Sequence, residues 1–225
     1  MSKEQPEILR VKRSKTDAQK SYDRLSGFYD LLSGGFENRF KLIALDKLGI
    51  QPGETVLEVG FGTGYCLEKI AQQTGVQGRV VGIDLSTGMQ KMANRRLARA
   101  GLEKQVELYY GDAAQLPFED RSFDAVFSSF CLELFDTPEI PSVLAEMKRV
   151  LKPGGRLSIL SMSKEKKASL MVKLYEWSHE CFPKFADCRP IFVKESVTEA
   201  GFEIVDDEKM NVAGLPARIV LARKA

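Results

Sequence analysis

The chain has 225 residues, 44% of them hydrophobic, and a formal net charge of +2. This length fits one large α/β domain, and the near-neutral charge gives no indication of a nucleic-acid partner. No apolar run approaches the roughly 18 residues that a membrane-spanning helix needs, and the amino terminus lacks a signal-peptide core, so we expect a cytoplasmic protein. The four cysteines are scattered and His179 is the only histidine. Because metal-ligand spacing is absent, we expect no metal site.

The amino-terminal part of the chain divides into two segments. Residues 1–16 are polar and basic, and we expect a flexible leader; the alternative is a patch that contacts anionic lipid or substrate. Apolar residues then recur at helical spacing, so residues 17–50 are expected to form helices ahead of the first strand. Tyr22 and Tyr29 lie in these helices and are expected to fold over the ligand site as a lid. We expect residues 17–225 to form a single domain.

A glycine-rich segment follows the first predicted strand. Val56–Tyr65 reads Val-Leu-Glu-Val-Gly-Phe-Gly-Thr-Gly-Tyr, and a helical pattern continues from its end. Glycines at alternate positions allow positive φ and carry no Cβ, so a ligand can lie against the backbone of Gly60, Gly62 and Gly64. In an open α/β sheet, ligands bind outside the carboxyl ends of the central strands. The segment therefore predicts a binding site for a nucleotide-like cofactor.

Strand and helix patterns alternate through the rest of the chain, which predicts a doubly wound, mostly parallel sheet. A further helical pattern at residues 170–181 is interpreted either as a surface helix docked on the sheet or as an inserted wall over a substrate pocket. Strands are expected at residues 79–84, 106–110, 123–128, 156–161, 202–205 and 217–221, with a connection at 206–216 between the last two. Helices are expected at 65–73, 86–101, 138–151 and 193–200.

Three carboxylates stand where a cofactor would meet them. Asp84 ends the second strand about 25 residues past the glycines, where an acidic residue accepts hydrogen bonds from ribose hydroxyls. Asp112 closes the third strand and can accept from an adenine amino group, while the Ala113 backbone N–H serves a ring nitrogen. Glu58 precedes the glycines and would repel a pyrophosphate but attract a cation.

Two chemistries use such a site: hydride transfer with a dinucleotide and methyl transfer from S-adenosylmethionine. The spacing is Gly-x-Gly-x-Gly rather than the Gly-x-Gly-x-x-Gly that seats a pyrophosphate. S-adenosylmethionine carries a sulfonium and an ammonium, which suit the negative charge of Glu58. These features favour S-adenosylmethionine as the cofactor.

Five ordered motifs resemble those of class I S-adenosylmethionine-dependent methyltransferases. The resemblance implies a Rossmann-like sheet of seven strands with the last strand antiparallel, extra amino-terminal helices and an inserted helix before the last two strands. It also implies the parts of the cofactor that each position would contact. Gly60, Gly62 and Gly64 would line the methionine moiety, and Ser128 or Ser129 would lie near the sulfonium. Asp84 would hold the ribose, Leu85 and Met89 would pack on the adenine, and Asp112 and Ala113 would contact the edge of that ring. The motifs are Glu58–Gly64, Gly82–Ser86, Gly111–Ala113, Ser122–Val126 and Arg149–Gly155.

Within that superfamily the chain is similar to the ubiquinone/menaquinone-biosynthesis methyltransferases and to phospholipid N-methyltransferase-like proteins. The similarity lies in Tyr22-Asp, Tyr29-Asp and Leu116-Pro-Phe118. It implies in-line methyl transfer to a small, apolar or lipid-like acceptor, such as an isoprenoid, with peripheral membrane contact as one option. Phe28, Phe130, Leu132 and Trp177 would frame an apolar pocket.

A base is needed only if the acceptor is a phenol, an alcohol or an acidic carbon. The candidates are His179, Glu133 and Tyr29. Two other interpretations stay open: a non-catalytic S-adenosylmethionine-binding module, and an enzyme that holds a soft acceptor such as arsenite on its thiols. The thiols in question belong to Cys66, Cys131, Cys181 and Cys188.

Overall fold

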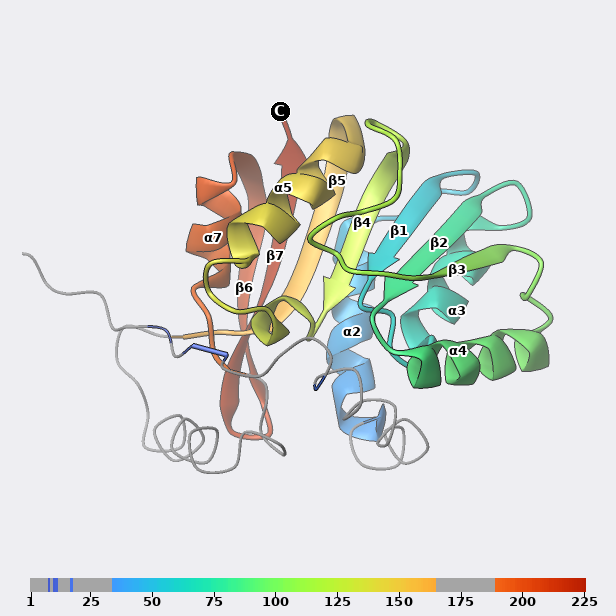
Figure 1. Ribbon diagram of the computed structural model, residues 1–225, viewed down its shortest axis with the longest axis horizontal. Helices are drawn as coiled ribbons and strands as arrows, with labels where there is room; N and C mark the ends of the chain where they lie inside the picture. The colour runs from blue at the N-terminus through green and yellow to red at the C-terminus, as the bar shows by residue number, and fades with distance from the viewer. Residues whose placement is uncertain (1–7, 9, 12–16, 18–33, 165–188) are drawn as a thin grey trace, which may run out of the picture.

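The computed structural model of the chain describes residues 8, 10–11, 17, 34–164 and 189–225. Its centre is a seven-stranded sheet (Figure 1) made of β1 Thr55–Val59, β2 Arg79–Asp84, β3 Val106–Tyr110, β4 Phe123–Ser129, β5 Leu151–Met162, β6 Phe202–Val212 and β7 Leu215–Lys224. The strand order is β3-β2-β1-β4-β5-β7-β6, and β7 is antiparallel to both of its neighbours. The predicted fold class is thereby confirmed.

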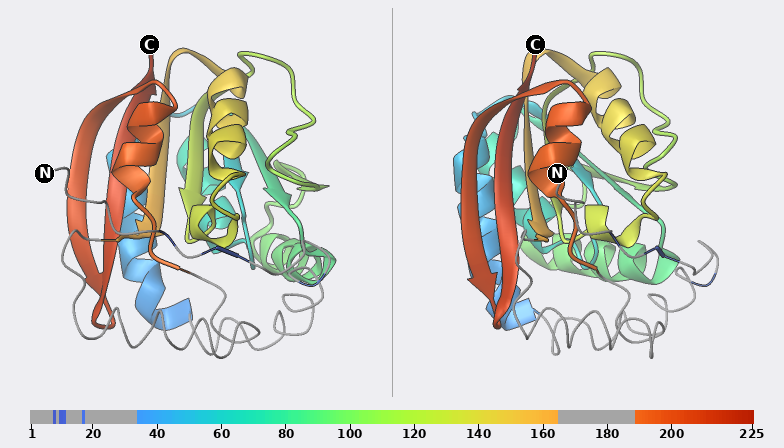
Figure 2. Two further views of the ribbon diagram at one scale, coloured as in Figure 1. Left: turned by 60° about the vertical axis from the view of Figure 1, so that its left-hand side comes forward. Right: turned by 90° about the vertical axis from the view of Figure 1, so that its left-hand side faces the viewer.

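Helices cover both faces of the sheet (Figures 1 and 2). Val56 and Leu57 in β1 are both fully buried but belong to different apolar clusters, because successive strand residues point to opposite faces. On one face lie α2 (Gly34–Leu48), α3 (Tyr65–Thr74) and α4 (Thr87–Ala100), and on the other lie α5 (Ile140–Val150) and α7 (Val193–Glu199). None of the helices in the described ranges is long and apolar enough to cross a membrane.

Local signals in the sequence explain several element boundaries. The side chain of Ser86 accepts a 3.0 Å hydrogen bond from the Met89 N–H and so caps α4. Gly101 ends the same helix in a left-handed conformation with φ of 69°. These caps fix where α4 begins, directly beyond the carboxyl end of β2.

Two predicted boundaries are wrong. Strand β5 begins at Leu151 rather than residue 156, because Leu151 pairs with Phe123 before a bulge restores regular pairing at Arg156. The connection predicted at 206–216 is instead mostly strand: β6 and β7 form a long hairpin (Figure 2). Its charged residues are tied by ion pairs such as Arg218 with Asp207, so their polarity does not end the strand.

Part of the expected leader contacts the domain. Arg10 donates hydrogen bonds of 2.8 and 2.6 Å to the carboxylate of Asp136, and the Val11 N–H donates to it at 3.0 Å. Ile8 is half-buried and packs against the apolar cluster under α5 and α7. The remainder of the leader, the helix expected at 170–181, and Tyr22, Phe28, Tyr29, Trp177, His179, Cys181 and Cys188 lie outside the described residues.

Candidate cofactor site

The glycine loop runs from the carboxyl end of β1 to the amino end of α3, at the lower edge of the sheet in Figure 1. Gly60 has φ of 73°, and a Cβ there would lie 2.3 Å from the Cys131 Sγ. Gly64 has φ of 81°, and its Cβ would lie 2.8 Å from that of Ala93. Gly62 also has positive φ, yet a Cβ there meets nothing within 4 Å. The outer glycines are therefore required by packing, whereas Gly62 faces open space that a ligand can enter.

Asp84 ties this loop to the second strand. Its Oδ2 accepts a hydrogen bond from the Gly62 N–H at 2.9 Å, and its Oδ1 accepts from the Ser86 N–H at 2.9 Å. The carboxylate is thus held beside the loop at the end of β2, where the prediction placed it. Leu85 is half-buried and Met89 is buried in α4.

Asp112 lies at the end of the neighbouring strand. Its Oδ1 accepts a 3.0 Å hydrogen bond from the Ala114 N–H, which fixes the turn after β3, and Ala113 is buried in the core. The Gly111 N–H donates to the Asp84 backbone oxygen at 3.0 Å. The ends of β2 and β3 are therefore joined, and both predicted acidic positions lie on one edge of the sheet.

Glu58 is the most unusual group at this edge. Its side chain is 1% exposed, and its Oε2 has no hydrogen-bond partner within the described residues. Burial raises the pKa of this carboxyl well above its usual range, the charge of Lys41 lowers it, and that of Asp84 raises it. Buried polar atoms are almost always paired, so this unpaired oxygen marks a position where a ligand could supply the missing hydrogen-bond donor.

The end of β4 supplies polar and strained positions. Ser128 is fully buried and its Oγ donates to the Val59 backbone oxygen at 3.1 Å, so this hydroxyl joins β4 to β1. Ser129 is 9% exposed. Phe130 has φ of 51°, a conformation rare outside glycine, where the chain leaves the strand. Strain of this kind is typical of functional loops.

The two cysteines within the described residues flank the loop and are buried free thiols. Cys66 and Cys131 are both buried, and burial raises the pKa of each thiol. A thiol ligand for a soft acceptor must ionise readily and be accessible, and neither group meets that requirement. Within the described part of the chain, no three His, Cys, Asp or Glu side chains gather as metal ligands.

Glu133 follows the same strand, on a short 3₁₀ turn at Leu132–Leu134. It is fully buried, with one carboxylate oxygen accepting from the Ser161 Oγ at 3.0 Å and the other from the Met162 N–H at 3.1 Å. Burial raises its pKa to about 7, which the hydrogen bonds from Met162 and Ser161 oppose. A role for Glu133 as a base stays a prediction, as do those of His179 and Tyr29.

Arg189 holds the backbone of this turn and was not anticipated. It is 1% exposed and donates to the backbone oxygens of Glu133 and Phe135 and to the Thr137 Oγ1, at 2.8 to 3.0 Å. Burial lowers its pKa to about 10. Its place could not be read from the sequence, because the partners lie more than 50 positions away.

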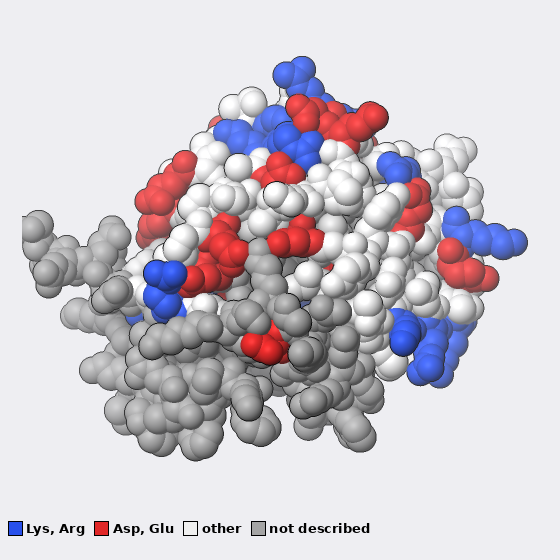
Figure 3. All heavy atoms as spheres, in the orientation of Figure 1, with Lys and Arg blue, Asp and Glu red and all other residues white. Residues whose placement is uncertain are grey.

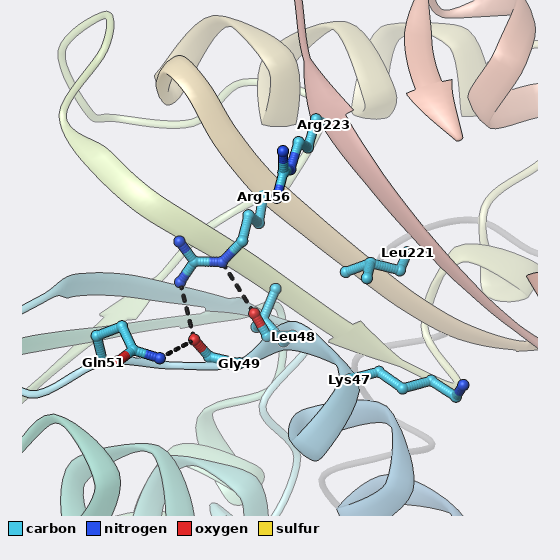
Figure 4. A pocket seen from close by; sticks show the side chains of 7 residues that line it. All are labelled: Lys47, Leu48, Gly49, Gln51, Arg156, Leu221 and Arg223. Carbon is cyan, nitrogen blue, oxygen red and sulfur yellow. Dashed lines mark hydrogen bonds between the residues drawn. The ribbon is translucent and has the colours of Figure 1, made fainter. Parts of the chain in front are cut away.

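A hollow of about 280 Å³ lies away from the loop, at the start of β5 (Figure 4). Arg156 points across it and donates to the Leu48 and Gly49 backbone oxygens at 2.9 and 3.3 Å and to Glu54 at 2.6 Å. These bonds cap the end of α2, which explains the polar groups here without a ligand. On the face shown in Figure 3, acidic and basic side chains of the described residues lie together at the upper edge, and basic side chains gather at the lower right, over α4.

Comparison with known proteins identifies the family of the chain. Residues 56–155 match a family described as "Methyltransferase domain". The chain is 40% identical over 147 residues to the ubiquinone/menaquinone biosynthesis C-methyltransferase UbiE of Pseudomonas fluorescens, covering 65% of this chain and 56% of that protein. It is 34% identical over 175 residues to the demethylmenaquinone methyltransferase of Lactobacillus johnsonii, covering 76% and 70%. The matched region is thus little more than half of the Pseudomonas protein's length.

Among solved structures, the [4+2]-cyclase SpnF superposes with a TM-score of 0.77 at 19% identity, over 97% of this chain and 99% of that one. That likeness concerns the fold alone. The sequence matches go further, and residues 56–155 of the family match include the glycine loop, Asp84 and Asp112. The chain belongs to the class I S-adenosylmethionine-dependent methyltransferases, in the ubiquinone/menaquinone-biosynthesis group.

Proposed function

We propose that the chain transfers a methyl group from S-adenosylmethionine to a small, apolar acceptor of the quinone-precursor type. The observation that carries the proposal is the buried, unpartnered Oε2 of Glu58, in a segment that reaches the open space at Gly62 four residues later. A cationic amino-acid moiety fits both, because it brings positive charge to the carboxylate and needs room against the bare loop. The names of the relatives support the class of acceptor.

Each residue of the edge has a place in this proposal. Asp84 would hold the ribose, with Leu85 and Met89 against the adenine. Asp112 and the Ala113 N–H would contact the edge of that ring, and Ser129 would lie near the sulfonium. The cofactor supplies an activated methyl and its own leaving group. The protein's contribution is then to hold the acceptor atom in line and to exclude water, which the apolar ring of Phe130 favours; Leu132, expected to frame the same pocket, is instead buried in the core.

The acceptor decides whether a base takes part. A phenolic acceptor must lose a proton as its ring carbon or oxygen attacks, whereas an amine needs only its lone pair. Glu133 is the described candidate with a pKa near neutrality, at about 7. Its carboxylate is turned toward β5, so action on an acceptor would require its hydrogen bonds with Ser161 and Met162 to open.

Calorimetric titration with S-adenosylmethionine tests the cofactor assignment. Asp84→Ala should weaken binding at least tenfold while the protein stays folded, and NAD(H) should not bind. Incubation with methyl-labelled cofactor and a demethylated naphthoquinol, with phosphatidylethanolamine vesicles as the alternative acceptor, then tests the acceptor. Label in the quinol supports the proposal, and label in the lipid favours a phospholipid N-methyltransferase. Tight binding with no transfer to either, or to a metabolite extract, favours a binding module.

A further inference from the structure

The outer side of α4 carries a row of basic side chains. Lys91, Arg95 and Arg99 follow one another at four-residue intervals, and all three are exposed. The buried residues of the helix repeat at the same interval two positions earlier, and they are Met89, Ala93 and Leu97. Two positions turn an α-helix by about 200°, and eight positions span about 12 Å. The basic row therefore runs along the side of α4 that is turned away from the sheet.

The charge of this row is not neutralised within the described part of the chain. α4 contains four basic residues and no acidic one. The fourth, Arg96, is turned back toward the protein: its Nε donates to the Thr63 backbone oxygen at 3.1 Å, and its guanidinium lies 5.7 Å from the centre of the Tyr65 ring. The three residues of the basic row form no ion pair with any residue in the described ranges.

The stability of the helix does not explain the row. Like charges four positions apart repel each other on a helix surface, and the row contains two such pairs, Lys91 with Arg95 and Arg95 with Arg99. A cation is favourable near the carboxyl end of a helix, where Arg99 lies, but not in its first turns, where Lys91 lies. The arrangement therefore weakens α4, and an anionic partner would offset that repulsion.

α4 borders the candidate cofactor site. The helix begins shortly after Asp84, the last residue of β2, and Arg96 joins it to the glycine loop through Thr63. In Figure 1 the helix runs along the edge of the sheet where the glycine loop lies, and in Figure 3 basic side chains gather over it at the lower right. A partner docked on the basic row would therefore meet the protein beside the candidate site.

The composition of α4 narrows the kind of partner. The helix has no aromatic residue, whereas proteins that bind single-stranded RNA stack its bases on aromatic side chains. The exposed positions between the three basic residues are Asn94 and Ala98, so the large apolar anchors of a protein–protein interface are also missing from the row. A row of charge without anchors suits the diffuse negative charge of a membrane that contains anionic lipid.

We propose that the basic row of α4 docks the protein on the surface of a membrane that contains anionic lipid. The inference rests on the proposed function and deepens it, because an apolar acceptor of the quinone-precursor type partitions into a membrane. Docking through α4 would bring the candidate site to the surface that holds this acceptor. Each basic residue close to an anionic surface strengthens binding roughly fivefold, so three residues give a preference of about a hundredfold for anionic over neutral lipid.

Sedimentation of the full chain with lipid vesicles tests the docking. At about 0.1 M salt the wild type should bind vesicles of phosphatidylcholine and phosphatidylglycerol about a hundredfold more tightly than vesicles of phosphatidylcholine alone. The preference should vanish near 1 M salt, where the screening length falls to about 3 Å. Equal binding to the two kinds of vesicle at the lower salt concentration would overturn the proposal.

Matched double variants locate the docking surface. Arg95→Gln with Arg99→Gln should weaken binding to the anionic vesicles roughly 25-fold, whereas Arg95→Lys with Arg99→Lys keeps the charge and should bind as the wild type does. Arg121→Gln with Arg223→Gln makes the same change of charge at two exposed residues near the opposite edge of the sheet, and it should have no more than about a twofold effect. Equal losses in the two glutamine variants would refute the role of α4.

Two further measurements separate docking from other roles of the row. Tighter binding to polyuridylate than to the vesicles, lost in Arg95→Gln with Arg99→Gln, would assign the row to nucleic acid and overturn the proposal. The same variant should transfer less methyl to a quinol embedded in anionic vesicles but act normally on a water-soluble quinol. A loss with both acceptors would mean that the row serves the cofactor site. Failure of the wild type to bind S-adenosylmethionine would instead refute the proposed function, while vesicle sedimentation still decides the docking.

Discussion

Substituting alanine at three glycines tests the assignment of the loop, because the three share a left-handed backbone but differ in surroundings. Gly60, Gly62 and Gly101 have φ of 73°, 53° and 69°. Each alanine should cost about 1–2 kcal/mol of stability from backbone strain alone. At Gly60 the new Cβ also meets the Cys131 Sγ at 2.3 Å, which adds about 1–3 kcal/mol of overpacking. At Gly62 and Gly101 it meets nothing within 4 Å.

The three substitutions should therefore rank differently by their loss of stability than by their loss of cofactor affinity. In urea denaturation Gly62→Ala and Gly101→Ala should lose similar amounts, and Gly60→Ala should lose roughly twice as much. For binding, Gly62→Ala should weaken S-adenosylhomocysteine roughly 5- to 150-fold in calorimetry, the equivalent of about 1–3 kcal/mol of crowding against the ligand. Gly101→Ala, at the far end of α4, should bind as the wild type does. If Gly62→Ala bound equally well, the loop would not face the ligand and the reasoning would be refuted.

Two smaller effects concern element ends. Ser86→Ala removes the hydrogen bond to the Met89 N–H and should cost about 1 kcal/mol in thermal or urea unfolding, whereas Ser86→Thr, which retains a capping hydroxyl, should cost less. Arg10→Ala should return the pKa of Asp136 from about 2 toward its ordinary 3.8, since the Arg10 hydrogen bonds are the main cause of the shift. Carboxyl NMR titration measures this, and an unchanged pKa would contradict the contact between the amino-terminal segment and the domain.

Much of the fold could be predicted because its signals are local. The strands at 79–84 and 106–110 match the structure to the residue, since each is an apolar run bounded by turn residues. The hairpin of β6 and β7 was missed because Asp206–Lys209 reads as a polar loop. In the structure this stretch is an edge strand, where charged side chains pair across the hairpin and with α2 and α7.

The residues of the candidate site likewise fall into those that local sequence signals indicate and those that depend on distant contacts. Glu58, Gly62 and Asp84 could be identified from spacing, because the strand, the loop and the next strand fix their places along a short stretch of chain. Arg189 could not, because its partners Glu133, Phe135 and Thr137 lie more than 50 positions away in the sequence. A lysine in a helix is ordinarily interpreted as solvated, and only the placement of α2 on the sheet shows that the Lys41 side chain is largely buried.

Substituting Glu133 tests whether the buried carboxyl that holds the turn after β4 is charged or neutral. Its pKa is about 7 in the folded protein against an ordinary 4.5, so the native state binds a proton that the unfolded chain releases between these values. The contribution of Glu133 to stability is fully present below pH 4.5 and is lost as the pH rises to about 7, a change of about 3 kcal/mol. Urea denaturation should show a shallower decline over this range for Glu133→Gln than for the wild type.

The exposed Glu203 on β6 provides the control, since Glu203→Gln should leave the decline unchanged. Identical declines in all three proteins would mean that Glu133 is ionised in the fold at every pH in this range. A carboxyl with a pKa near neutrality is what a base for a phenolic acceptor requires, yet the same carboxyl accepts the hydrogen bond by which Ser161 holds the turn to β5. Comparing the pH profile of methyl transfer with that of stability, in wild type and Glu133→Gln, therefore separates a base from a structural carboxyl. Only a base shifts the first profile, while both roles shift the second.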